Sequence, residues 1–369
     1  MFQDLFQETS QACIFRLASR HRWRIVCGSP GMKWRQIHIP KSIKRLAIVL
    51  PLFALAAYLL GEVFFNVSSN VVALSFRESK EPLAVHTRSG GWKNITAMNV
   101  AELDASLHER HREPGLRWCS LAVRREPRTL AQWVTQGLFG AEVNILWISP
   151  DKFDMLTTFK PKFELTTASE RLSAENLWFS INANFREPNG KPLGWVYHEG
   201  RQVNGSFPAW TGCFFVKQGT PYFGPQSLLD EVPGPIQEGT QGYPSVMKSH
   251  TVFPYVMMKD TNHFDGTKIS YRSLAGMKKD GTLVFVLSGD GGVMNISEVT
   301  EIAKRLEVQH ATCLDGGKAL QYSIRTGVGI RHFRAYNTTL PLTHRLLVRE
   351  RSPVYIGARR KAPEIITPP

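Results

Sequence analysis

The predicted fold and site depend on the stretch Leu314-Asp315-Gly316-Gly317. One short apolar run leads into it and a second follows it. An aspartate followed by two glycines at the end of a buried strand leaves the sheet on a backbone that has no Cβ in the way. Such a backbone lets main-chain N–H groups and one carboxylate come close to a ligand. The same residue types also suit an ordinary turn, so the tripeptide alone does not decide between a turn and a site.

The residues upstream of this stretch predict one α+β unit. Two strand-like runs, residues 269–277 and 282–287, flank an Asp-Gly pair of the kind that forms two-residue hairpin turns. A helix capped by Asn295 or Ser297 comes next, since apolar residues then recur at helical spacing: Val299, Ile302, Ala303 and Leu306. We therefore predict an α+β fold with a mixed, largely antiparallel sheet and helices packed on it.

Two further polar residues are candidates for a site shared with Asp315. The apolar run 177–181 ends at Asn182, whose amide can donate and accept hydrogen bonds at once, although asparagine is also a common turn former. Arg272 alternates with apolar neighbours in the first hairpin strand. A sheet arginine usually faces water, but in a covered strand its charge needs an anion.

Residues 46–65 form the long apolar run of the chain, and about 20 residues suffice for a helix to cross a bilayer. Pro51 is tolerated in a membrane helix. Lys41, Lys44 and Arg45 precede the run, so the positive-inside rule predicts a cytoplasmic N-terminus and an extracytoplasmic remainder, periplasmic or lumenal. The alternative is a buried helix of a soluble domain.

The net charge of +14 is concentrated at the two ends of the chain. Residues 1–45 hold nine Lys and Arg against two acidic residues, and residues 340–369 hold six against two. The long middle is therefore close to ordinary, which disfavours nucleic acid as a partner. No Cys-x-x-Cys pair or histidine spacing typical of zinc occurs, so we expect no metal site, although a carboxylate-bound divalent cation stays open.

Ordered blocks of residues carry a more specific signal: Ile181-Asn182-Ala183-Asn184-Phe185, Pro192-Leu193-Gly194 with Glu199-Gly200, Gln241 with Pro244, Arg272 to Gly276, and Leu314 to Gly317. In their order and spacing these blocks resemble the phosphodiester glycosidase family over about residues 140–330, and most closely its uncharacterised bacterial branch. The expected organisation is a basic cytoplasmic segment, a transmembrane signal anchor, a linker with the first part of the exported region, a phosphodiester glycosidase-like domain and a basic Pro-containing tail, over residues 1–45, 46–65, 66–140, 141–336 and 337–369.

The resemblance implies a membrane-anchored hydrolase without a cofactor. Its substrate would be a sugar-1-phosphodiester or glycopolymer, cleaved between the anomeric carbon and the phosphate to release free sugar and a phosphomonoester. Arg272 would bind two phosphate oxygens, and Asp315 would act as nucleophile or base at an oxocarbenium-like carbon. Asn182 would hold a sugar hydroxyl or the phosphate. Further substrate contacts are expected from Gly316 and Gly317 through their N–H groups, and from Asn184, Gln241 and Lys318.

Two departures from the family pattern leave a rival interpretation open. Lys318-Ala319 stands where the family usually has glycine or serine followed by serine, and Ala183 follows the asparagine where the family often has glycine. Lys318 either adds a cation for phosphate or faces solvent. No second carboxyl is evident, and Glu199, Asp265 and Asp290 are only candidates. The rival is a non-catalytic module of the same fold that binds carbohydrate or the cell envelope.

Overall fold

The computed structural model describes residues 41–65, 67–254, 259–260, 264–335 and 350–362. The chain divides into two compact units, residues 1–60 and residues 61–369, and the second is called the folded unit below. Most of the expected cytoplasmic segment, residues 1–40, lies outside the described residues, as do residues 337–349 and 363–369 of the expected tail.

The apolar run 46–65 lies in helix α1 (Lys41–Phe65), which contains Pro51. Among the described residues, no single helix has the length and hydropathy of a membrane span, whereas Val49–Glu62 and Val67–Glu78, bent by 77°, have them only as a pair. The second helix of that pair, α2 (Val67–Glu78), packs into the folded unit, because Val72, Ala73 and Phe76 are fully buried.

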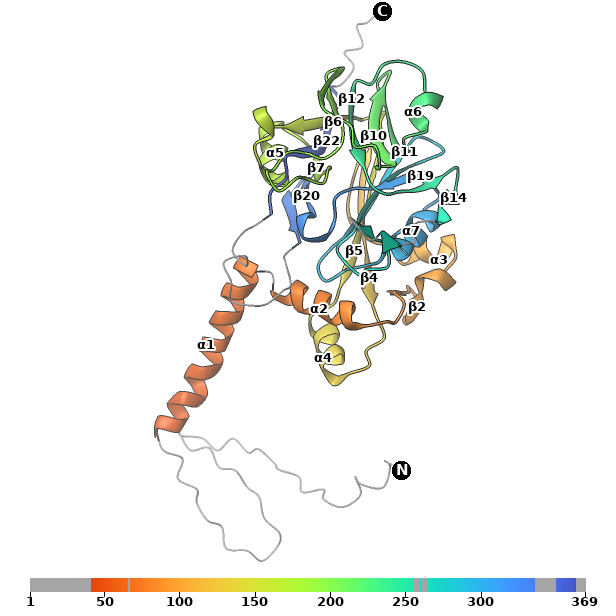
Figure 1. Ribbon diagram of the computed structural model, residues 1–369. Helices are drawn as coiled ribbons and strands as arrows, with labels where there is room; N and C mark the ends of the chain where they lie inside the picture. The colour runs from red at the N-terminus through yellow and green to blue at the C-terminus, as the bar shows by residue number, and fades with distance from the viewer. Residues whose placement is uncertain (1–40, 66, 255–258, 261–263, 336–349, 363–369) are drawn as a thin grey trace, which may run out of the picture. The chain divides into compact units, whose positions relative to one another are not determined.

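A large antiparallel sheet runs through the folded unit (Figure 1). Its strands follow the order β14-β13-β19-β17-β18-β5-β4-β1-β2, with β3 paired to β4. Their bounds are β14 (Thr251–Val252), β13 (Ser245–Lys248), β19 (Val308–Cys313), β17 (Ser273–Lys278), β18 (Leu283–Ser288), β5 (Glu142–Ile148), β4 (Leu116–Arg124), β1 (Ala84–His86), β2 (Trp92–Asn94) and β3 (His108–Glu113).

Two smaller antiparallel sheets and one hairpin complete the strand structure of the described residues. One sheet has the order β21-β20-β7-β22-β6: β21 (Gly329–Arg334), β20 (Gln321–Thr326), β7 (Phe179–Asn182), β22 (Val354–Arg360) and β6 (Phe153–Phe159). The other has the order β11-β10-β12-β8-β9: β11 (Thr220–Pro225), β10 (Gly212–Lys217), β12 (Glu238–Gly242), β8 (Val196–His198) and β9 (Arg201–Asn204). The hairpin is β15 (Lys259–Asp260) with β16 (Phe264–Asp265).

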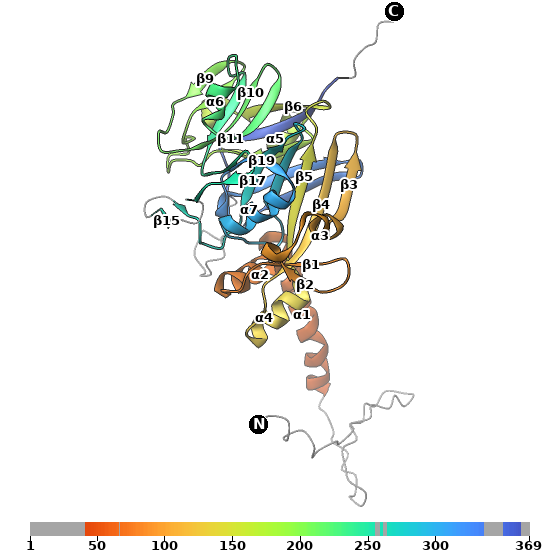
Figure 2. The ribbon, with the colours of Figure 1, turned by 90° about the vertical axis from the view of Figure 1, so that its right-hand side faces the viewer.

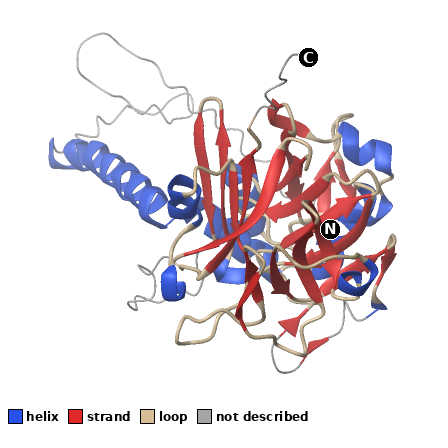
Figure 3. Cartoon of the chain, turned by 90° about the horizontal axis from the view of Figure 1, so that it is seen from above, coloured by secondary structure: helices blue, strands red, loops and turns tan. Residues whose placement is uncertain are grey.

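The main core lies where the three sheets face one another. Phe285 of β18 contacts Phe179 of β7, with ring centroids 4.7 Å apart, and Phe223 of β11 at 5.3 Å. All three rings are buried, so one aromatic group joins the large sheet to both smaller ones. Figure 3 shows the strands gathered inside this unit and helices outside them. The remaining helices are α3 (Val100–Ala105), α4 (Leu130–Phe139), α5 (Ala168–Ala174), α6 (Leu228–Glu231) and α7 (Ile296–Arg305).

The α+β class, the antiparallel pairing and the local unit before Asp315 are confirmed. β17 and β18 form the predicted hairpin. Helix α7 begins after Asn295, whose side chain accepts from the N–H of Glu298 while the Glu298 carboxylate accepts from the N–H of Asn295. The apolar face of α7 is buried over β17, β18 and β19 (Figure 2), as its spacing predicts.

The expected boundaries differ from the observed ones at both ends of the domain. β22 was assigned to the basic tail, but it lies between β7 and β6, with Tyr355 paired to Asn182. Its run Val-Tyr-Ile-Gly-Ala is buried, and the arginines that follow are exposed. Residues 66–140 are likewise more than a linker, because β4 is hydrogen-bonded along the length of β5. In β22 the two arginines stand at the end of the strand, so the basic composition of the tail did not reveal the apolar strand before them.

Candidate active site

The ends of β7 and β19 meet, and this brings Asn182 to the Asp-Gly-Gly loop as predicted. The N–H of Asp315 donates to the carbonyl of Ala183 at 3.1 Å. The fully buried Asn182 side chain donates to the carbonyl of Asp315 at 2.8 Å and accepts from the N–H of Gln321 at 2.9 Å. Asn182 therefore clamps both sides of the loop, and its amide is engaged by the protein's own backbone.

The two glycines are required by the close approach of the Tyr271 backbone at Gly316 and by the positive φ of Gly317. A Cβ on Gly316 would lie 2.7 Å from the carbonyl oxygen of Tyr271. Gly317 has φ +61°, and its N–H donates to that same oxygen at 2.7 Å. The N–H of Gly317 is therefore engaged within the protein, contrary to its predicted role as a donor to the substrate.

Asp315 carries a buried carboxyl among charged side chains. It is 6% exposed, and no hydrogen bond from a described residue reaches its carboxyl oxygens. Burial raises the pKa of Asp315 well above its ordinary value; Arg186 lowers that pKa, Glu350 raises it and Lys318 lowers it. A carboxyl with a raised pKa, next to cations, is typical of sites that transfer protons.

Arg186, Glu350 and Lys318 are also joined to each other, and together with Asp315 we call them the charged cluster. One Glu350 carboxylate oxygen lies 2.6 Å from the Arg186 guanidinium, and the other lies 3.1 Å from Nζ of Lys318. The side chains of Arg186 and Glu350 are partly exposed and that of Lys318 is 61% exposed, so the cluster reaches from buried Asp315 to solvent.

Arg272 is not placed as predicted. Its backbone lies beside Gly316, but its guanidinium donates to the carbonyls of Asp265 at 3.0 Å and Lys268 at 2.6 Å, and more weakly to that of Met294. It is not among the charged groups that shift the pKa of Asp315. The covered arginine did need acceptors, and backbone carbonyls supply them in place of a phosphate.

Asn184 and Gln241 are also engaged within the protein. The Asn184 amide donates to the carbonyls of Leu193 and Gln241 and accepts from the hydroxyl of Thr240. The Gln241 side chain accepts from the N–H groups of Trp195 and Phe207 and donates to the Phe207 carbonyl, each at 2.9 Å. Both are buried, so they organise the loop after β7, and their predicted contacts with substrate stay a prediction.

Sequence reasoning missed Arg186 and Glu350. Arg186 follows the end of β7 by four residues, so a charge directly after a buried strand was the available signal. Glu350 is brought in by long-range pairing: the side chain of Gln321 donates to its carbonyl at 3.2 Å, and β22 begins four residues later. The suggested partners Glu199, Asp265 and Asp290 are not among the groups that shift the pKa of Asp315.

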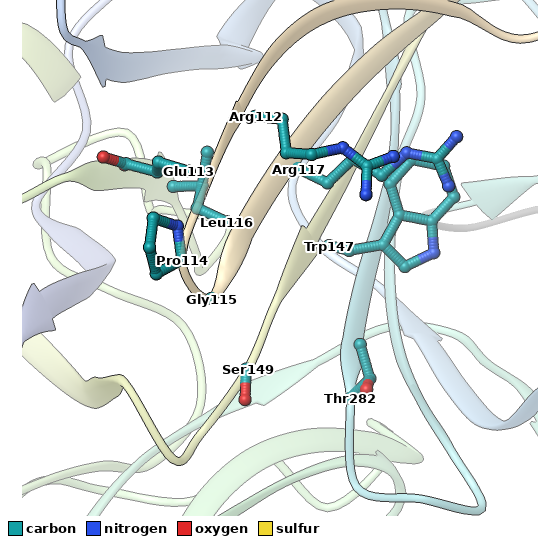
Figure 4. Close-up of a pocket in the computed structure, with 9 residues that line it drawn as sticks. All are labelled: Arg112, Glu113, Pro114, Gly115, Leu116, Arg117, Trp147, Ser149 and Thr282. Carbon is teal, nitrogen blue, oxygen red and sulfur yellow. The ribbon is translucent and has the colours of Figure 1, made fainter.

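One cavity formed by described residues lies away from the charged cluster. Figure 4 shows one of about 590 Å³ at the β3–β4 turn, where Arg112 and Arg117 lie beside Trp147. Both arginines are ion-paired to Glu109. No member of the charged cluster lines the cavity in Figure 4. Among the described residues, no three His, Cys, Asp or Glu side chains are grouped to hold a metal ion.

Residues 175–346 match the family model of phosphodiester glycosidase. This stretch contains Asn182, Arg186, Asp315 and Lys318, and it stops just before Glu350. Residues 175–346, somewhat less than half of the 369-residue chain, are therefore similar to a phosphodiester glycosidase domain. The resemblance seen in the ordered sequence blocks is thus confirmed, and the match supports a hydrolase of the glycosidase type.

Three solved structures are similar to this chain, and the first of them has a TM-score high enough to indicate a shared fold. The catalytic domain of zebrafish N-acetylglucosamine-1-phosphodiester alpha-N-acetylglucosaminidase, auto-inhibited by its pro-peptide, matches with 16% identity and a TM-score of 0.51, over 75% of this chain and 95% of that one. A hypothetical protein from Synechocystis matches at 13% identity and TM-score 0.44, over 68% of this chain and 63% of that one. A putative exported protein from Burkholderia pseudomallei matches at 10% identity and a TM-score of 0.43, over 76% of this chain and 92% of that one. Curated protein sequences give no match.

Proposed function

We propose that the charged cluster hydrolyses sugar-1-phosphodiesters. Water adds its oxygen to the anomeric carbon, the bond from that carbon to the bridging phosphate oxygen breaks, and the products are a free sugar and a phosphomonoester. The observation that carries the proposal is the buried, pKa-raised carboxyl of Asp315 beside two cations. A substrate with one negative charge and an electron-poor anomeric carbon needs that combination.

Each member of the cluster has a role in this reaction. The guanidinium of Arg186 binds two phosphate oxygens at once, and Lys318 adds a second positive charge from the exposed side. Asp315 takes the proton of the attacking water and stabilises the developing positive charge on the sugar. Glu350 holds both cations in place before substrate binds. Phosphate is a good leaving group, so no second acidic carboxyl is required.

The test is a panel of sugar-1-phosphate diesters offered to the purified full-length protein, with release of free sugar measured. N-acetylglucosamine-1-phosphodiesters head the panel, because a protein of the same fold is named for them. Turnover by wild type that is lost in Asp315→Asn supports the proposal. Binding of a glycan without any turnover supports the rival module, which the side chain of Lys318 in place of a small residue favours.

We also propose that α1 anchors the protein in a membrane with the domain outside the cytoplasm. The apolar run within α1 and the lysines and arginine before it support this orientation. A reporter enzyme fused after Pro369 should be active only when exported. A reporter active in the cytoplasm would reverse the proposed topology.

A further inference from the structure

Helix α4 presents its apolar side chains to solvent. Its sequence, LAQWVTQGLF, has no charged residue. The exposed fractions are 77% for Leu130, 66% for Trp133, 38% for Val134, 71% for Leu138 and 38% for Phe139. Leu130, Trp133, Val134 and Leu138 are separated by three, one and four residues, which is helical spacing, so they form one apolar face, with Phe139 at its end. We call it the α4 face.

The polar side chains of the same helix point into the protein. Gln132 is buried, and its side chain accepts from the N–H of Arg128 at 2.8 Å. Gln136 accepts from the N–H of Arg125 at 3.2 Å and donates to the hydroxyl of Ser75 on α2 at 3.3 Å. These bonds and the capping box of Thr129 fix the rotation of the helix, so α4 cannot turn its apolar face inward without losing them.

The arrangement is the reverse of that of α7 in the same protein. In α7 the apolar residues Val299, Ile302 and Ala303 are fully buried, as expected of a helix on a water-soluble surface. Single exposed apolar residues need no explanation, but a contiguous apolar face on one helix marks a contact with something other than water.

Chain continuity indicates a lipid bilayer as that contact. α4 packs beside α2 at one end of the folded unit (Figures 1 and 2), and α2 begins two residues after the last residue of α1. A very short connection therefore joins the apolar stretch of α1 to α2, the helix against which α4 packs. Leu74 of α2 is itself 40% exposed. Tryptophan favours the boundary between lipid and water, and the exposed Lys80 suits the phosphates of anionic lipids, whereas the exposed Arg128 is paired with Glu81.

We propose that α4 lies in the plane of the membrane surface with the α4 face inserted among the lipid head groups and upper acyl chains, so that the domain docks on the bilayer. The polar inward side keeps its bonds to the protein, and the apolar outward side leaves water. This goes beyond the glycosidase function and does not depend on it, because no member of the charged cluster takes part.

The test uses the full-length protein in nanodiscs of phosphatidylcholine and phosphatidylglycerol, with bromine placed at a shallow position on the acyl chains. The emission of Trp133 is isolated by subtracting the spectrum of Trp133→Phe, which keeps the face apolar. We expect that difference emission to lose most of its intensity on brominated lipid and to be shielded from aqueous iodide. Replacing Leu130 and Leu138 by serine should restore quenching by iodide.

A matched control places tryptophan on an exposed site outside the α4 face. Val328, at the β20–β21 turn, is 100% exposed, so Val328→Trp in the Trp133→Phe background should be quenched by iodide and not by bromine. Trp133 emission that responds to iodide alone would overturn the proposal. Shielding that grows with protein concentration in the absence of lipid would also overturn it, and would identify a second copy of the chain as the occupant.

Discussion

Two groups of buried polar side chains lie near the end of β7, and they differ in how fully the protein satisfies them. The amides of Asn182, Asn184 and Gln241 each have both a donor and an acceptor partner inside the fold. The carboxyl of Asp315 has neighbouring charges but no hydrogen bond from a described residue. Satisfied amides fix the backbone, whereas a buried carboxyl with a raised pKa is costly to keep and is typical of sites where chemistry needs it. The predictions below test that division between scaffold and site.

The largest effect is expected from Asp315→Asn. Loss of the proton-accepting carboxyl should lower kcat roughly 10²- to 10⁴-fold. The unfolding free energy should not fall near pH 7, because a neutral amide replaces a carboxyl whose charged form is disfavoured by burial.

The stability difference has a defined pH dependence. The pKa of Asp315 is raised in the folded state. The contribution of this carboxyl to the free energy of unfolding is therefore fully present below its unfolded pKa of about 3.9, and it is lost as the pH rises through the folded-state pKa. The free energy of unfolding of Asp315→Asn, measured in urea, should therefore rise relative to that of wild type as the pH increases. Asp290→Asn, at an exposed carboxyl, is the control. A variant that retains most of its kcat would remove Asp315 from the site.

The two arginines should fail in different ways. Arg186→Ala should lower kcat/KM on the order of 10²-fold, since a charged donor to the phosphate is lost, with little change in unfolding. Arg272→Ala should instead lower the unfolding free energy by about 2–4 kcal/mol, because carbonyls of Asp265 and Lys268 lose their donor. Measurements of kcat/KM and of denaturant unfolding on both variants test this difference. The reverse pattern would return the phosphate site to Arg272.

Asn182→Ala should lower the free energy of unfolding more than it lowers catalytic activity. It leaves the carbonyl of Asp315 and the N–H of Gln321 without partners in a fully buried position, so the unfolding free energy should fall by about 2–5 kcal/mol. Asn189→Ala, on an exposed loop, should cost less than about 1 kcal/mol. Equal effects of the two substitutions would show that the clamp between β7 and the Asp-Gly-Gly loop is not structural.

The smallest effect is expected from Glu350→Gln. Glu350 raises the pKa of Asp315, so its neutralisation should move the acidic limb of the kcat/KM profile to lower pH. Arg186 lowers that pKa, so Arg186→Ala should move the limb to higher pH. Activity measured from pH 4 upward, at about half-unit steps, reports both directions. A limb that moves the same way in both variants would mean that another group sets it.

Local sequence patterns were sufficient to predict some features of this structure but not others. The hairpin around Asp280-Gly281, the cap at Asn295 and the meeting of Asn182 with Asp315 follow from turn chemistry, capping and strand ends. The roles of Arg272 and Gly317 could not be predicted, because which acceptor or donor fills their bonds depends on the distant carbonyls of Asp265 and Tyr271. Glu350 was missed for the same reason, since only the pairing of β22 with β7 brings it near.

The place of β22 has a consequence for how the protein is made. This strand is the last of the described chain, yet it inserts between β6 and β7, both made some 200 residues earlier. Until residue 360 has been synthesised, β7 lacks one neighbour and Glu350 has no strand to hold it beside Arg186. The charged cluster is therefore complete only after β22 has paired with β7.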